Sequence, residues 1–436
     1  MSERTPSWGI EPVPERLRTF GALDNAMLWS SLGLSLLVLV AGTVLVPALS
    51  LRAALLAIVI GGVFGNVLLG LAALLGAEAR VPAMVLLRAP LGRTGSFLPT
   101  ALNVLQNIGW TVFEVLVIAT AACALVHGPL WVWKLVAAAA ATALALVGPI
   151  GFVREWVRRF ALWVVLASLA YLTWWALHDA NLSALWFRPG KGGFPTFWQG
   201  VDLMVAMPVS WLPLAADYTR FSRGGRSAFW GTTVGYFIPN VWLYALGAIL
   251  LLTRGLSDAP SVLTAIAAGG AAAAIALLAL GVDETKEPFA NIYSAAVSLQ
   301  NVVPRMPQRA LIVVVAAVAT AGTFVIDLVQ YASFLLLLGS FFVPLFGVLL
   351  AQWLVGVRDP FTTREVRTGQ IVAWFAGFGL YQWLSPSGPG WWTHLVEVTH
   401  PAIGGSLPSF AAAFLLSIAL TLPARAAARR HRTSLA

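Results

Sequence analysis

The chain has 436 residues, of which 59% are hydrophobic and 10% charged, with a mean hydropathy of +0.83. A soluble domain carries about 25% charged residues, so this composition excludes an ordinary water-exposed globule and indicates a membrane protein. A single cysteine, Cys123, excludes a disulfide framework and a Cys-rich metal site. The formal net charge of +9 has a meaning only once the basic residues are placed relative to the bilayer.

Residues 1–23 are polar and lack the apolar core of a signal peptide. From residue 24 onward, apolar stretches follow one another, each near the roughly 20 residues that cross about 30 Å of hydrocarbon as a helix. The sequence therefore predicts an all-α polytopic membrane protein. Its twelve expected spans are 24–47, 53–76, 97–125, 131–150, 158–177, 199–218, 228–252, 272–300, 309–330, 332–356, 370–385 and 404–423.

The basic residues alternate between the two sides that these spans define. Of the 27 Lys and Arg, 21 fall in the terminal segments and in every second loop, five fall in the opposite loops, and Lys286 lies inside a span. By the positive-inside rule, this asymmetry predicts that both termini are cytoplasmic. The positive net charge then reports orientation, and a nucleic-acid partner is not needed to explain it.

The spacing of the spans also predicts an internal repeat. The first five spans occupy residues 24–177 and the next five occupy 199–356, with a connection at 178–198, two further spans within 357–423 and a basic tail at 424–436. Because five is odd, the second block enters the bilayer from the opposite side. Two inverted repeats of this kind surround a binding site near the midplane in many transporters, where interrupted helices form the site.

Candidate interruptions differ between the two blocks. The sixth span carries Pro208 and Pro213, each of which removes a backbone donor and crowds the preceding turn. The first span offers only Gly33, Gly42 and serines, which is a weaker signal for unwinding. For the sixth span, an interrupted helix and a plain proline kink are both open.

The third span has a polar stripe. Asn103, Asn107, Trp110 and Glu114 are spaced by four, three and four residues, which places them on one helical face. Membrane asparagines usually make interhelical hydrogen bonds, and we expect this for Asn103 and Asn107. An ionisable group inside a span is costly, so Glu114 is a candidate functional residue.

The eighth span holds a second group of polar residues. Asp283, Glu284, Lys286 and Glu287 lie within five positions, and a continuous helix over 272–300 would place Asp283 and Glu287 on one face with three later polar residues, Asn291, Ser294 and Ser298. Lys286 lies three residues after Asp283, within reach of an ion pair. Structural pairing and ion coupling are both open for this group. Thus two spans concentrate the charges that a bilayer should exclude.

Two tryptophans, Trp110 and Trp211, lie deep within the third and sixth spans, whereas most others lie near span ends. A buried indole usually serves packing. The neighbouring Glu114 and the prolines of the sixth span favour a slot for a flat ring, and both alternatives stay open.

Taken together, these segments resemble the nucleobase:cation symporter family, which includes purine and cytosine permeases and carriers of hydantoin, allantoin and hydroxymethylpyrimidine. The resemblance is carried by LWSSLGLSLLVLVAGTVL, LLRAPLGRTGSFLPTALNVLQNIGWTVFE, SWLPLAADYTRF and DETKEPFANIYSAAVSLQN. It implies a LeuT-type fold of two inverted five-helix repeats followed by two more helices.

The resemblance also implies roles for individual residues. Trp110 and Trp211 would stack on the two faces of a heteroaromatic ring, and Glu114 and Asn291 would bind its edge. The remaining substrate-binding candidates are Ser35, Asn107 and Ser210, and the cation-coupling candidates are Ser31, Leu34, Asp283, Thr285, Lys286 and Glu287.

Two positions depart from the family pattern. Glu114 stands where several members have an amide, and an ionised carboxylate accepts hydrogen bonds without donating them. It favours a ring with adjacent donors, such as an aminopyrimidine, over hydantoin or uracil. Lys286 stands where a sodium ligand is expected, and an ammonium there repels Na⁺. These departures favour proton over sodium coupling.

The sequence hypothesis is a monomeric importer in the inner membrane, taking hydroxymethylpyrimidine or cytosine first, with a proton or Na⁺ as coupling ion and no other cofactor. A purine, allantoin or hydantoin carrier of the same family is the alternative. From another class, a polytopic membrane enzyme is less favoured, because the chain has no HExxH motif and no Asp-rich pair on a basic loop.

Overall fold

The computed structural model describes residues 11–147, 162–178, 180–300, 302–303, 305–388, 390–395 and 403–433. Within these ranges the regular secondary structure is helical, apart from one isolated bridge between Phe20 and Ser222. The helices of the first half are η1 (Glu15–Leu17), α1 (Ala22–Gly33), α2 (Leu36–Thr43), α3 (Leu51–Ala79), α4 (Ala83–Leu86), α5 (Arg88–Leu91), α6 (Phe97–Val126), α7 (Leu130–Val147) and α9 (Leu162–Leu177).

The second half continues the same architecture and ends with a helix pair on one side of the bundle. Its helices are α10 (Leu182–Phe187), α11 (Phe197–Ser210), α12 (Leu212–Thr219), α13 (Gly225–Arg254), α14 (Ala259–Ala268), α15 (Ala271–Glu284), α16 (Lys286–Gln300), α17 (Gln308–Gly322), η3 (Leu328–Gln330), α18 (Tyr331–Leu354), α19 (Thr368–Leu384), α20 (Gly390–Leu395) and α21 (Ser406–Thr433).

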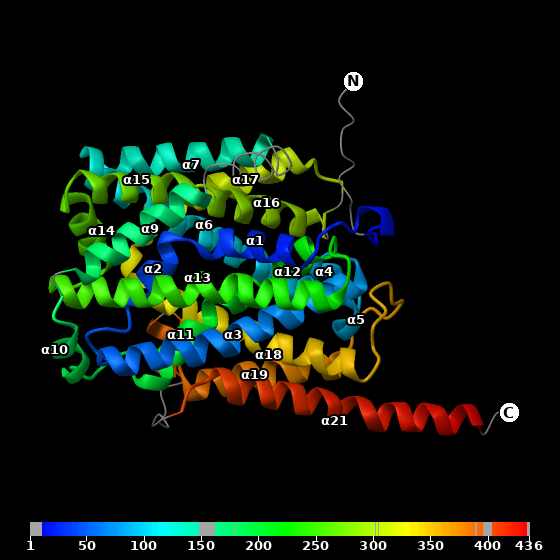
Figure 1. Ribbon diagram of the computed structural model, residues 1–436. Coiled ribbons are helices and arrows are strands. Elements are labelled where there is room, and N and C mark those ends of the chain that lie inside the picture. Colours follow the sequence, from blue (N-terminus) through cyan, green and yellow to red (C-terminus); the bar gives the residue numbers. More distant parts are fainter. Residues whose placement is uncertain are drawn as a thin grey trace.

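The long helices run side by side, with α7, α15 and α17 along one side and α19 and α21 along the other (Figure 1). Among the described residues, five helices are long and apolar enough to cross a membrane, and α1 with α2 would make a sixth as one span bent by 59°. The remaining expected spans coincide with shorter or less apolar helices. Residues 148–150 and 158–161 of the fourth and fifth expected spans lie outside the described ranges.

Connections expected on one side of the membrane gather at one end of the bundle. The amide of Phe20 donates to the carbonyl of Phe221 over 3.1 Å, and the amide of Arg93 donates to the carbonyl of Arg364 over 2.9 Å. At the opposite end, the amide of Lys191 donates to the carbonyl of Pro47 over 2.9 Å. Figure 1 shows η1, α4 and α5 at the first end, and α10 and α14 at the second. These described contacts pair connections that the span count places on the same side.

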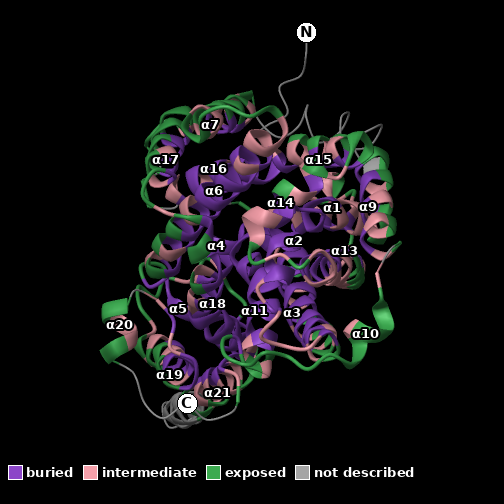
Figure 2. Ribbon diagram, turned by 90° about the vertical axis from the view of Figure 1, so that its left-hand side faces the viewer, coloured by how far each residue is buried: buried purple, intermediate pink, exposed green. Residues whose placement is uncertain are grey.

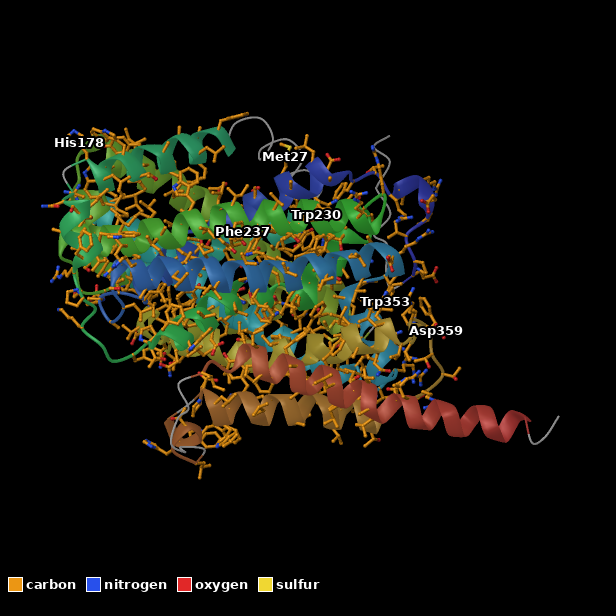
Figure 3. The ribbon with its side chains drawn as sticks, turned by 60° about the horizontal axis from the view of Figure 1, so that its bottom comes forward. Met27, His178, Trp230, Phe237, Trp353 and Asp359 are labelled. Carbon is orange, nitrogen blue, oxygen red and sulfur yellow. The ribbon has the colours of Figure 1, made fainter. Side chains whose placement is uncertain are left out.

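Burial separates an inner group of helices from an outer layer. α2, α11, α6 and α16 are mostly buried, whereas exposed residues line the outward faces of α7 and α17 (Figure 2). Apolar side chains cover outward faces as well: Trp230, Val234 and Ile238 of α13 are all exposed, and Figure 3 shows Trp230 and Phe237 along this helix. An apolar outer face is what a helix bundle in lipid requires, because hydrocarbon offers polar groups no partners.

The first span is interrupted more strongly than the sixth. Between α1 and α2, Leu34 (φ −87°, ψ 81°) and Ser35 (φ −132°, ψ 143°) leave the helical conformation. Between α11 and α12, Trp211 stays right-handed (φ −84°, ψ −10°) although Pro208 lies within α11. The eighth span departs from the expected continuous helix: it divides into α15 and α16 at Thr285, because Pro288 has no N–H to hold the turn before it.

Glycines let the first interrupted span lie close to α13. A Cβ on Gly42 of α2 would lie 2.0 Å from the carbonyl oxygen of Tyr244, and one on Gly247 would lie 2.0 Å from that of Leu39. Only glycine permits this approach of two backbones. The contact fixes α2 in the centre of the bundle, directly beside the break.

Candidate functional site

The polar stripes of the third and eighth spans face each other. The Asn103 amide on α6 donates to the Ser298 hydroxyl on α16 over 2.9 Å, and the Asn291 amide on α16 donates to Glu114 Oε1 on α6 over 2.7 Å. The two helices therefore pack antiparallel through their polar faces. The interhelical bond expected for Asn103 is observed. Asn107 is buried, and neither of its side-chain polar atoms has a hydrogen-bond partner among the described residues.

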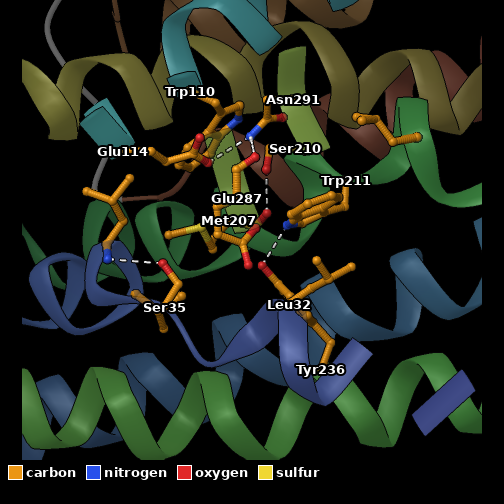
Figure 4. A pocket seen from close by; sticks show the side chains of 13 residues that line it. Leu32, Ser35, Trp110, Glu114, Met207, Ser210, Trp211, Tyr236, Glu287 and Asn291 are labelled. Carbon is orange, nitrogen blue, oxygen red and sulfur yellow. Dashed lines mark hydrogen bonds between the residues drawn. The ribbon is translucent and has the colours of Figure 1, made fainter. Parts of the chain in front are cut away.

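A cavity lies where these stripes meet the two interrupted spans. Figure 4 shows side chains from α1, α2, α6, α11, α13 and α16 converging on it. Its lining residues are Leu32, Ser35, Leu37, Val38, Trp110, Glu114, Met207, Ser210, Trp211, Leu214, Tyr236, Glu287 and Asn291.

Two indole rings line this cavity, and each contacts further aromatic side chains. The Trp211 Nε1 donates to the Tyr236 hydroxyl over 2.7 Å, and the edge of Trp29 packs on Trp211 with ring centroids 5.8 Å apart. Trp110 packs edge-on against Phe334, with centroids 5.3 Å apart. Rings that are fixed in this way present a preformed apolar slot, which reduces the ordering cost of binding a flat ligand.

Two carboxylates reach the cavity from opposite helices. Glu114 on α6 and Glu287 on α16 are each 3% exposed. Glu114 Oε2 and Glu287 Oε1 have no hydrogen-bond partner among the described residues, whereas Glu114 Oε1 is held by Asn291. A buried charged oxygen without a partner is costly, so these two atoms mark places where a ligand can donate.

The break in the first span is closed by a third carboxylate. Glu284, at the end of α15, accepts the Ser35 hydroxyl over 2.7 Å and the Leu36 amide over 2.6 Å. Leu36 is the first residue of α2, so the carboxylate also lies at the positive end of that helix dipole. The contact ties the eighth span to the first and fixes Ser35 at the edge of the cavity.

Lys286 lies on the other side of the same break. Its ammonium pairs with Asp283 and lies 3.4 Å from the Leu34 carbonyl oxygen. Both side chains of the ion pair are about 8% exposed. Of the positions expected to hold a cation, Leu34 and Lys286 are thus brought together. The Thr285 hydroxyl instead donates to the Val282 carbonyl of its own helix, and Ser31 is buried outside the cavity lining.

Six of the seven expected substrate residues line the cavity, and Asn107 does not. Glu287, expected in the cation set, lines the same cavity. Sequence reasoning missed Tyr236 and Met207, which carry no signal beyond their place in apolar spans. It placed Glu284 in the charged group of the eighth span but did not predict its contact with Ser35 and Leu36.

Metal-binding geometry is lacking in the part of the chain that the structure describes: no three or more His, Cys, Asp or Glu side chains are grouped to hold an ion. The charged residues at the break instead satisfy one another and the backbone.

The comparison with protein families identifies the group to which this site belongs. Residues 12–370 match the family described as permeases for cytosine/purines, uracil, thiamine and allantoin. The chain belongs to this permease family. A comparison with curated protein sequences gives no match.

Solved structures share the fold of this permease. Mhp1, a nucleobase-cation-symport-1 family transporter, in a closed conformation with bromovinylhydantoin bound, superimposes with a TM-score of 0.75 at 19% identity, over 97% of this chain and 95% of that one. The inward-facing conformation of Mhp1 gives 0.77 at 18% identity, over 98% and 96%. A manganese transporter from Eremococcus coleocola gives 0.59 at 16% identity, over 96% and 97%.

These matches confirm the all-helical LeuT-type fold that the sequence predicted. The permease is a polytopic membrane transporter of small nucleobase-like molecules and is not an enzyme.

Proposed function

We propose that this permease imports an aminopyrimidine, with hydroxymethylpyrimidine or cytosine first, by alternating access driven by protons and not by sodium. The observation that carries the proposal is the cavity itself. Two fixed indoles, Trp110 and Trp211, line a slot for a flat ring, and Glu114 and Asn291 meet at its edge with 2.7 Å between amide and carboxylate. A stacking slot with one polar edge suits a nitrogen heterocycle.

The polar edge favours donors on the ring. Asn291 occupies one oxygen of Glu114 and leaves the other free, and an ionised carboxylate accepts without donating. An aminopyrimidine offers an exocyclic amino group and, when protonated, an adjacent ring N–H. Mhp1 was solved with a hydantoin, whose ring carries carbonyl acceptors. The carboxylate at position 114 therefore supports a different preference in this permease.

The preference for protons is supported by the position of Lys286. Its ammonium lies at the Leu34 carbonyl and pairs with Asp283, in the region where the family resemblance would place a sodium ion. A fixed positive charge there repels Na⁺ and already supplies the carbonyl with a partner. We also propose that the permease is a monomer of the inner membrane with both termini cytoplasmic, as the distribution of Lys and Arg predicts.

Uptake of labelled bases tests the substrate proposal. Cells that express Trp110→Ala or Glu114→Gln should lose aminopyrimidine uptake, because each change removes one element of the slot. The matched controls are Trp230→Ala on the outer face of α13 and Glu78→Gln on the surface, both exposed and remote from the cavity. Normal uptake by both site variants would reject the proposed site.

Proteoliposomes test the coupling ion. We expect an imposed proton gradient to drive accumulation and a sodium gradient to have little effect in the wild type. The double variant Asp283→Asn with Lys286→Thr removes both charges of the ion pair together and places a hydroxyl near the Leu34 carbonyl, so sodium should begin to stimulate uptake. A strict sodium requirement with Lys286 intact would overturn the proton assignment.

A further inference from the structure

We propose that the substrate is bound as a cation held between Glu114 and Glu287, so that the permease selects nitrogen heterocycles whose ring is protonated and excludes neutral dicarbonyl rings. This inference rests on the proposed function, since it concerns the same cavity, and it adds the charge of the ligand and a second acidic contact from α16. The family resemblance gave Glu287 no place at the substrate.

The charges around the cavity are unbalanced. Its lining includes two carboxylates and no Lys, Arg or His. The one nearby ammonium, that of Lys286, is engaged by Asp283 and the Leu34 carbonyl, and a further carboxylate, Glu284, is bound to the neutral Ser35 and the Leu36 amide. Three further acidic side chains, Glu114, Glu284 and Glu287, thus share this poorly solvated region with one ammonium that Asp283 already pairs. A cationic ligand supplies a counter-charge.

The free carboxylate oxygens come from two neighbouring helices that line the cavity. Glu114 Oε2 belongs to α6 and Glu287 Oε1 to α16, and both are buried without a hydrogen-bond partner among the described residues. The side chains of both residues extend toward the space between Trp110 and Trp211 (Figure 4). A ligand there meets two carboxylate acceptors, which the N–H donors of a protonated aminopyrimidine can satisfy.

Four donors of the lining are already used within the protein. The Asn291 amide nitrogen donates to Glu114 Oε1 over 2.7 Å and to the Glu287 backbone carbonyl over 3.2 Å, which accounts for both of its hydrogens. The Ser210 hydroxyl donates to the Met207 carbonyl. The Ser35 hydroxyl donates to Glu284 and the Trp211 Nε1 to Tyr236.

These four side chains therefore have no free N–H or O–H donor for a ligand. The carbonyl oxygens of a uracil-type ring would lose their water and find few donors, at the cost of unsatisfied buried acceptors. An amidine-like ring, in which a ring nitrogen conjugated with an amino group is protonated, presents N–H donors from both groups. The complementarity is one of hydrogen-bond polarity as well as charge, and both point to the same class of ligand.

Binding of matched probes to the purified full-length permease tests the inference. 4-Amino-5-hydroxymethyl-2-methylpyrimidine serves as the donor-rich, protonatable ring and uracil as the neutral dicarbonyl ring, each measured by calorimetry with the wild type, Glu287→Gln, Glu287→Asp and the surface control Glu78→Gln. We expect the wild type to prefer the aminopyrimidine. Glu287→Gln should reduce that preference about tenfold or more, through weaker aminopyrimidine binding, and Glu287→Asp should retain it.

A purely structural role for Glu287 would weaken both probes equally and leave their ratio unchanged. An unchanged ratio in Glu287→Gln, or a wild type that prefers uracil, would overturn the inference while leaving a nucleobase transporter in place. If Glu287→Gln does not fold, the ratio of aminopyrimidine to uracil affinity in the wild type alone tests the inference. If neither probe nor any other nucleobase binds, the proposed function itself fails.

Discussion

The two interrupted spans of this permease break in different ways and expose opposite backbone groups. At the α1–α2 break, two residues unwind and the Leu36 N–H is left for a partner, which Glu284 supplies from α15. At the α11–α12 junction, the Leu214 amide donates to the Trp211 carbonyl, and the Ser210 carbonyl accepts the Gln106 side chain of α6 over 2.9 Å instead. One break is closed by an anion and the other by an amide donor.

The difference shows what an interruption requires inside a membrane. Backbone groups that lose their helical hydrogen bond have no water to bind in the bilayer, so each needs a partner from another helix. A carboxylate that closes the first break brings a charge into the protein interior, and Lys286 and Asp283 lie next to it. The second break needs only a neutral side chain. The ionisable groups of this site therefore gather around the first break, where coupling to a cation is expected.

The largest effect is expected from Glu284→Ala. The change leaves the Leu36 N–H and the Ser35 hydroxyl without their acceptor in a buried site, at a cost of about 2–5 kcal/mol in unfolding free energy. Thermal unfolding in detergent with a parallel uptake assay measures it. Glu284→Gln keeps one acceptor oxygen, so its loss of unfolding free energy should be clearly smaller. Wild-type stability and uptake for Glu284→Ala would show that the first break needs no side-chain partner.

Gly42→Ala should be the next most damaging change. Its added Cβ would lie 2.0 Å from the Tyr244 carbonyl oxygen, so α2 and α13 must separate, at about 1–3 kcal/mol. Gly281→Ala on α15 is the matched control, since nothing lies within 4 Å of the added carbon. Equal unfolding temperatures for the two variants would contradict the close packing of the first interrupted span.

Gln106→Ala tests the second break. It removes the donor to the Ser210 carbonyl and to the Asn103 side chain, and we expect a loss of about 1–2 kcal/mol. The same unfolding assay detects it, and substrate affinity should fall because Ser210 lies in the cavity lining. A loss equal to that of Glu284→Ala would show that the two breaks depend on their partners to the same extent.

Pro208→Ala should have the smallest effect, about 1 kcal/mol or less, because the α11 helix continues through this position and a restored N–H finds a helical acceptor. Unfolding temperature and uptake should both stay near the wild type. A severe loss of transport with normal stability would indicate that the proline, and not the Gln106 contact, sets the shape of the second break.

Periodicity predicted the facing stripes well because it is a local property. Asn103 and Glu114 lie on the same face of α6, and Asn291 and Ser298 lie on the same face of α16. Antiparallel packing of the two helices therefore pairs Asn103 with Ser298 and Glu114 with Asn291. The breaks were harder. Prolines directed attention to the sixth span, yet the stronger interruption lies at Leu34 and Ser35, where no proline stands. Its stability depends on Glu284, which is about 250 residues away and invisible to a local pattern.

Asp202 illustrates the same limit. This buried carboxylate on α11 accepts the backbone amides of Gly405 and Ser406 over 2.7 and 3.0 Å, and so holds the start of α21. The sequence contains the charge inside a span but not its partner, because backbone amides have no sequence signature. The role of Asp202 as a link between the second repeat and the last helix follows only from the packed structure.

Composition and the spacing of apolar stretches were enough to predict a polytopic membrane protein with an inverted repeat, because hydrocarbon thickness and helix rise fix the length of each span. The LeuT type was implied by the family resemblance. The distribution of Lys and Arg predicted the protein's orientation, because these residues are enriched in cytoplasmic loops. Tertiary structure alone decided that Glu287 reaches the substrate cavity and that Glu284 closes the first break. These two residues lie three apart in sequence on either side of the break at Thr285, and only the packing of the other helices determines which of them meets the cavity and which meets the backbone.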